Sequence, residues 1–202
     1  MTLPDRATVE TALAPLEPVL TDAFLRAWKD WRGTPYAGHW QKRGRANFVW
    51  EQAVHYATVA ISQMSNVKVV PKNHSFHFLV DGKVAFRLKK ADSSGFTSNY
   101  PTQEALCFHD PQLPLTGVSS AQRVEVTYVL DKTGTSISDI AVVARNGKSV
   151  EWTYSLLRQE SVVALPSNQP DSAPAKNSAS TGLVRPKTQK KKQDEAADNG
   201  KQ

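Results

Sequence analysis

The chain has 202 residues, of which 40% are hydrophobic, and its formal net charge is +6. Its single cysteine, Cys107, excludes an internal disulfide and a metal site built from several thiolates. No apolar run reaches the roughly 20 residues of a membrane-spanning helix, and residues 1–20 carry no apolar signal segment. We therefore expect a soluble, cytoplasmic protein with no membrane association.

Helical periodicity dominates the beginning of the chain. Apolar residues recur every three or four positions, but Pro15 and Pro18 should interrupt the first such stretch. This leaves a main helix over 21–31, with Thr21 as its N-cap. A second apolar stripe predicts a helix over 45–64. These two helices are expected to form a structural pair.

The following part of the chain shows alternating patterns typical of β-strands. Asp81-Gly82 and Asn146-Gly147 are dipeptides that mark tight hairpin turns. A short helix is predicted between the two hairpins, over 101–109. The predicted strands cover residues 76–80, 83–89, 123–131, 137–145 and 149–156.

The composition changes at residue 166, after which small, polar and proline residues predominate. Such a segment has little to bury, so 166–202 is predicted to be disordered. It holds seven Lys or Arg and four Asp or Glu, and thus half of the net charge. Its basic run over 185–193 could contact nucleic acid or simply keep the protein soluble.

The order of these elements predicts an α+β fold. We expect a single domain over 1–165, in which an N-terminal helical pair packs on an antiparallel sheet of about five strands. The disordered tail follows. No alternation of strands and helices supports a dinucleotide-binding fold.

Enzymatic activity is the least favoured class of function. The sequence has no glycine-rich phosphate loop and no hydrolase or metalloprotease motif, so no cofactor or metal is expected. Cys107 lies close to His109, but neighbouring positions on a helix point in different directions. In the strand pattern of metal-dependent nucleases, Arg87 occupies the place of a metal-binding carboxylate.

The first predicted hairpin offers a candidate nucleic-acid surface. A two-residue turn would pair Phe78 with Ala85 and Phe76 with Arg87, and paired residues share a face. Aromatic rings beside cations can stack bases and neutralise phosphates. Alternatively, a helix covers the rings and the cations lie at its rim. The candidate residues are Phe76, Phe78, Lys83, Arg87 and Lys89.

A candidate anion site follows the hairpin. Asn99 precedes Pro101, and a capping residue before a proline is typical of a helix start. The N–H groups of that helix end, together with Arg87, Lys89 and Lys90, could hold one phosphate or carboxylate.

The same predicted helix contains the pattern Q-x-x-L-x-F, formed by Gln103, Leu106 and Phe108. This pattern resembles the peptides with which bacterial replication and repair proteins dock on the DNA sliding clamp. In such a peptide the leucine and phenylalanine fill an apolar pocket, and the glutamine amide forms hydrogen bonds at its edge. The alternative is that Leu106 and Phe108 pack in the core of the domain.

Four short segments carry a second resemblance: RLKK at 87–90, SNYPTQ at 98–103, YVLD at 128–131 and VEW at 150–152. They are similar to segments of uncharacterised bacterial proteins associated with toxin–antitoxin loci, and the family resembles the SocB-like toxins that block replication by occupying the sliding clamp. The resemblance implies a non-enzymatic inhibitor with the clamp and a cognate antitoxin as partners. Its clamp contact would be Gln103, Leu106 and Phe108.

Overall fold

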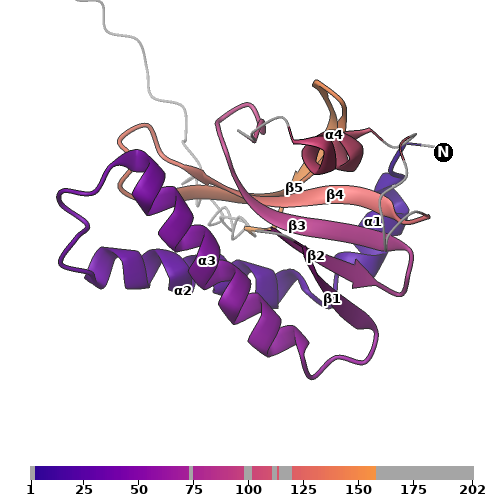
Figure 1. The fold of residues 1–202 in the computed structure, drawn as a ribbon, viewed down its shortest axis with the longest axis horizontal. Helices are drawn as coiled ribbons and strands as arrows, with labels where there is room; N and C mark the ends of the chain where they lie inside the picture. Colours follow the sequence, from indigo (N-terminus) through magenta and orange to yellow (C-terminus); the bar gives the residue numbers. More distant parts are fainter. Residues whose placement is uncertain (1–2, 73–74, 98–101, 111–112, 114–119, 158–202) are drawn as a thin grey trace, which may run out of the picture. The chain divides into compact units, whose positions relative to one another are not determined.

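The computed structural model describes residues 3–72, 75–97, 102–110, 113 and 120–157, all within a compact unit formed by residues 1–161 (Figure 1). Asn99, the predicted boundary at 165 and the predicted tail lie outside the described residues. The helices are α1 (Arg6–Leu13), α2 (Glu17–Gly33), α3 (Lys42–Ile61) and α4 (Gln103–His109). The strands are β1 (Val67–Lys72), β2 (Ser75–Val80), β3 (Val84–Ala91), β4 (Gln122–Leu130), β5 (Ile137–Asn146) and β6 (Ser149–Ser155).

The predicted α+β class is confirmed, with a sheet of six strands in the order β1-β2-β3-β4-β5-β6. Neighbouring strands are antiparallel except β3 and β4, which are parallel because the chain crosses over through α4 between them. The sheet is therefore mixed, in contrast to the antiparallel one expected. The strand absent from the prediction is β1, where Pro71 is tolerated because β1 lies at the sheet edge.

Helix α2 is longer than predicted, and both α2 and α3 start earlier than predicted. Pro18 lies in the first turn of α2, where the N–H that proline lacks has no helical partner. Thr21 is therefore inside α2, and the prediction that it caps the helix is wrong. A separate helix, α1, is capped by the Asp5 carboxylate, which accepts a hydrogen bond from the Thr8 N–H.

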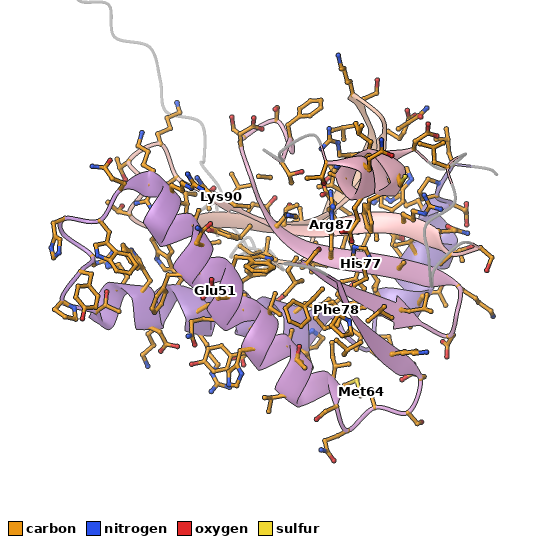
Figure 2. All side chains as sticks on the ribbon, viewed as in Figure 1. Glu51, Met64, His77, Phe78, Arg87 and Lys90 are labelled. Atoms are coloured by element: carbon orange, nitrogen blue, oxygen red, sulfur yellow. The ribbon has the colours of Figure 1, made fainter. Side chains whose placement is uncertain are left out.

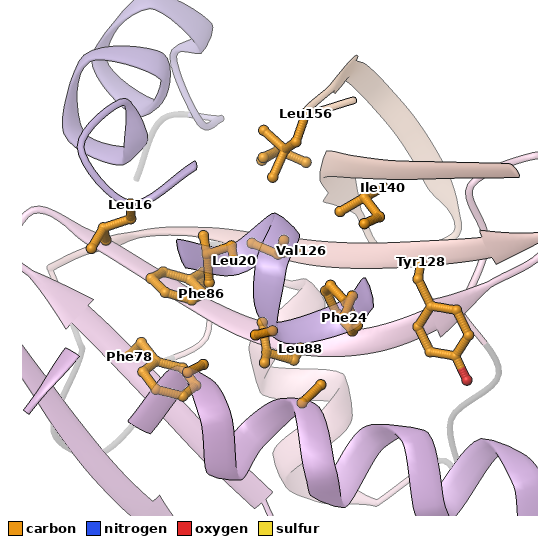
Figure 3. Close-up of a cluster of buried hydrophobic side chains, with 14 of the residues drawn as sticks. Leu16, Leu20, Phe24, Phe78, Phe86, Leu88, Val126, Tyr128, Ile140 and Leu156 are labelled. Atoms are coloured by element: carbon orange, nitrogen blue, oxygen red, sulfur yellow. The ribbon is translucent and has the colours of Figure 1, made fainter. Parts of the chain in front are cut away.

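The main core lies between the helices and one face of the sheet (Figure 3). Phe24 of α2 packs on Tyr128 of β4, with ring centres 5.3 Å apart. The sheet contributes a continuous apolar surface to this core, since alternate residues of β2 to β5 point toward the helices. Its fully buried members are Phe78, Val80, Val84, Phe86, Leu88, Val124, Val126, Tyr128, Ile140, Val142 and Ala144.

The turn of the first hairpin is longer than predicted, so the predicted assignment of side chains to the two faces of the hairpin is wrong. Phe78 pairs with Phe86 and Val80 with Val84, so the turn has three residues instead of two. One extra residue moves every side chain of the second strand to the other face. Phe78 and Phe86 thereby stack in the core with ring centres 4.9 Å apart, while Arg87 lies on the opposite face. The predicted face that combines Phe78 with Arg87 does not exist.

Candidate anion-binding pocket

A pocket of about 480 Å³ lies between the beginning of α3 and the C-terminal end of β3, and we call it the basic pocket. Figure 2 shows Lys90 on β3 beside this part of α3. Four cationic residues line the pocket: Lys42 and Arg43 from α3, and Lys89 and Lys90 from β3. Lys42 and Arg43 are exposed, whereas Lys89 and Lys90 are half-buried. The pocket thus has a cationic wall on each side.

Two cations of the basic pocket, Lys42 and Lys90, repel each other. Burial lowers the pKa of Lys90, and the charges of Arg45 and Lys42 lower it further. Burial likewise lowers the pKa of Lys89, with a second contribution from Arg87. In the described part of the chain, no carboxylate forms an ion pair with any of the four pocket cations. An anionic ligand would relieve this repulsion.

Asp92 is the one acidic residue lining the pocket within the described ranges. Its Oδ1 accepts hydrogen bonds from the Ser94 N–H, the Ser94 hydroxyl and the Phe96 N–H. The bond from the Ser94 hydroxyl contributes most to holding its pKa below the ordinary value. Asp92 thus stabilises the turn after β3. The residues that line the pocket carry one negative charge and four positive charges.

Two aromatic side chains complete the basic pocket. The Trp50 indole N–H donates to the Leu88 carbonyl at 2.9 Å, which fixes the orientation of the ring against β3. Phe96 is held by the Asp92 turn, and the guanidinium carbon of Arg145 lies 5.0 Å from its ring centre. Both rings are half-buried. The pocket therefore offers apolar ring surface as well as positive charge.

A buried polar network lies on the face of the sheet opposite the main core, and Arg145 connects it to Phe96. The Arg87 Nε and Nη2 donate to Glu125 Oε1 at 2.9 and 2.8 Å, and the Thr97 hydroxyl donates to Oε2 at 2.9 Å. The Arg145 Nη1 donates to Thr97 Oγ1 at 3.1 Å. His109 Nε2 lies 2.8 Å from Arg87 Nη2. One carboxylate thus stands among two arginines and a histidine.

The network sets the charge states of its members. Burial raises the pKa of Glu125, but the attraction of Arg87 and the hydrogen bonds to Glu125 outweigh it, so the pKa is lowered overall. Burial is the main cause that lowers the pKa of His109 to about 4, and Arg87 and Arg145 add to it against the opposing effect of Glu125. The neutral imidazole can then accept a hydrogen bond from Arg87.

Helix α4 covers part of the same face. Phe108 is 3% exposed and packs on Ala85 and Ala121, with the guanidinium carbon of Arg87 4.1 Å from its ring centre. Arg123 binds the end of α4 by donating to the carbonyls of Cys107, Asp110 and Leu113. The residue that caps the helix is Thr102, whose hydroxyl accepts from the Ala105 N–H.

The structure separates the residues of the predicted nucleic-acid surface. Phe78 is buried in the main core, and Phe76 is half-buried and packs against Trp50 of α3. Lys83 lies exposed in the β2–β3 turn, and Arg87 is buried in the polar network. Lys89 and Lys90 do come together, in the basic pocket.

The residues of the Q-x-x-L-x-F pattern are divided between the two sides of α4. Gln103 and Leu106 face outward, and Leu106 is 54% exposed, but Phe108 faces the sheet. The three side chains therefore do not form one surface in this conformation.

Sequence reasoning did not identify Lys42, Arg43, Trp50 and Phe96 as site residues. The sequence did contain one signal for Lys42 and Arg43, which is the run KRGR at the start of the second helix. Cations at that end of a helix lie beside the positive end of the helix dipole, which is unfavourable. Only the packing of α3 on β3 shows that this run meets Lys89 and Lys90.

The described ranges contain no group of three or more His, Cys, Asp or Glu side chains placed to hold a metal ion. Within the same ranges, no helix has the length and apolarity required to cross a membrane. The chain matches no protein-family model, no curated protein and no solved structure.

Proposed function

We propose that the protein binds nucleic acid, and that the basic pocket is the centre of the contact. The observation that supports this proposal is the cluster of Lys42, Arg43, Lys89 and Lys90 around one pocket without ion-pair partners among the described residues. Such clustering destabilises the free protein and is relieved by phosphate groups. The half-buried rings of Trp50 and Phe96 also give the pocket apolar surface, which a cluster of charged side chains alone does not have.

The double substitution Lys42→Gln with Lys90→Gln tests this proposal. We expect weaker binding of short fluorescent oligonucleotides in anisotropy titrations, because two phosphate contacts are lost. The slope of log K against log salt should fall in magnitude by about 1.4, at about 0.7 for each contact with a single strand. Thermal stability should stay equal or rise, since like charges are separated.

Lys83→Gln provides the matched control, since Lys83 lies at the other end of β3 from the basic pocket. It removes one positive charge, as each of the two pocket substitutions does, and should change affinity and salt slope little. Equal effects of Lys83→Gln and the pocket substitutions would contradict the proposal. So would the absence of binding by the unchanged protein at low salt.

The exposure of Gln103 and Leu106 favours a second candidate function, docking on the bacterial sliding clamp as a toxin-like inhibitor without enzymatic activity. The glutamine and leucine are available in the described conformation. Engagement of Phe108 would require α4 to leave the sheet and to uncover the Arg87–Glu125 pair. The test must therefore separate the exposed residues from the buried one.

For this candidate, Leu106→Ala is expected to weaken capture by purified clamp about tenfold with unchanged unfolding free energy, because an exposed anchor is lost. Leu25→Ala, which shortens a leucine 45% exposed on α2, is the control and should leave capture unchanged. Pull-down with immobilised clamp measures the effect. Equal capture of both variants and the unchanged protein would refute docking through this motif.

A further inference from the structure

The basic pocket combines features that go beyond attraction of a polyanion. A convex cationic surface suffices to hold the backbone of a duplex, whereas here the cations surround a concavity of about 480 Å³. This volume falls in the range of pockets that hold drug-sized ligands, and a mononucleotide is a ligand of that size. The bases of a duplex are stacked inside and cannot enter such a pocket.

The side chains in the pocket suit an unpaired base. Trp50 and Phe96 present half-buried rings, and base–aromatic stacking is the main sequence-tolerant interaction in single-strand binding. The exposed amide of Asn47 also lines the pocket and can form hydrogen bonds with the edge of a base. The cations on both walls are placed to contact the flanking phosphates.

Both rings are held in position before a ligand arrives. The hydrogen bond to the Leu88 carbonyl fixes Trp50, and the Asp92 turn and Arg145 hold Phe96. Arg145 is anchored in turn through Thr97 to Glu125. Little ordering of the protein is then needed on binding, which favours affinity.

We infer that the basic pocket receives one unpaired base of a single-stranded nucleic acid, with Trp50 as the stacking platform and Phe96 beside it. This inference rests on the proposed nucleic-acid binding and names its substrate class. Binding should therefore prefer single strands to the corresponding duplex. It should also require the base itself, in addition to the phosphates.

The test compares Trp50→Phe with Trp50→Leu, using a short oligothymidylate, the same strand with abasic sites, an oligouridylate and a duplex. Both substitutions remove the hydrogen bond to Leu88, so their difference reports the aromatic ring. Trp50→Leu should bind the oligothymidylate about 5- to 150-fold more weakly than Trp50→Phe, from about 1–3 kcal/mol for each stacked base. The abasic strand should bind both variants equally.

Each outcome separates this inference from the proposed function. Salt-dependent binding with equal affinity for intact and abasic strands would overturn the base pocket and leave polyanion binding in place. The absence of binding to every strand would overturn both. Oligouridylate, which differs from oligothymidylate in the sugar and in the 5-methyl group of the base, should also bind because stacking tolerates both changes. A preference for the duplex would refute the inference. Circular dichroism of both variants verifies that they are folded.

Discussion

Replacement of Glu125 by alanine is expected to lower the free energy of unfolding by about 3–5 kcal/mol, the cost of breaking a buried ion pair by removing one partner. Glu125 is 1% exposed, and its carboxylate accepts three hydrogen bonds from Arg87 and Thr97. Without it, Arg87 and Arg145 face each other in the protein interior with no carboxylate between them. Urea denaturation followed by circular dichroism measures the change.

Two controls make this prediction specific. Glu151→Ala removes an exposed carboxylate from β6 and should change stability by less than about 1 kcal/mol. The double substitution Glu125→Leu with Arg87→Met removes both charges, so it should cost less than Glu125→Ala alone. If Glu125→Ala were as mild as Glu151→Ala, the carboxylate would not be required to balance the arginines. The unfolding measurement thus tests the network independently of any function.

Acidification is expected to destabilise the protein between about pH 6.5 and about pH 4 because of His109. Its pKa is about 4 in the folded state, compared with 6.5 for an unperturbed histidine, so the unfolded chain binds the proton first. Stability from neutral His109 is therefore complete above pH 6.5 and is lost as the pH falls toward 4. We expect a loss on the order of 1–3 kcal/mol, allowing for partial solvent screening.

His109→Gln should flatten this part of the pH profile, since glutamine can accept the hydrogen bond from Arg87 but cannot become charged. His55→Gln changes an exposed histidine of α3 and should leave the profile as it is in the unchanged protein. Urea midpoints measured across the pH range report the difference. Parallel profiles for the unchanged protein and His109→Gln would show that His109 does not cause the acid sensitivity.

The polar network and the basic pocket are connected through Arg145. Arg145 contacts both Thr97, which binds Glu125, and the ring of Phe96, which lines the pocket. A substitution that releases Arg145 should therefore loosen Phe96 as well. Variants of Glu125 should be compared in binding only under conditions in which they are folded.

Much of the secondary structure followed from the sequence. The strand pattern over 123–131 and the hairpin at Asn146-Gly147 correspond to β4, β5 and β6, because alternation and turn preference are local properties of the chain. The helical stripe over 45–64 corresponds to α3, shifted by about one turn. Boundaries were less accurate, as Pro18 shows by lying inside α2 instead of ending the preceding segment.

The candidate site was only partly accessible to sequence reasoning. Lys89 and Lys90 were identified as anion-binding candidates, and both line the basic pocket. Phe78 was assigned to a surface but lies in the core, because its facing depended on the length of one turn. Trp50 lies within the helix predicted over 45–64, whose apolar stripe gave no reason to single it out. Nothing local distinguishes an aromatic ring that fills a core from one that lines a pocket.

The sequence by itself determined the class of fold and the positions of most helices and strands, since both depend on periodicities and turn residues that act over a few neighbours. Only the tertiary structure decided which residues share a face and which distant segments meet. A three-residue turn placed Phe78 opposite Phe86 and moved Arg87 to the far side of the sheet, where Glu125 neutralises it. The packing of α3 on β3 created the basic pocket. Both outcomes depend on contacts between residues far apart in the chain, which local patterns do not contain.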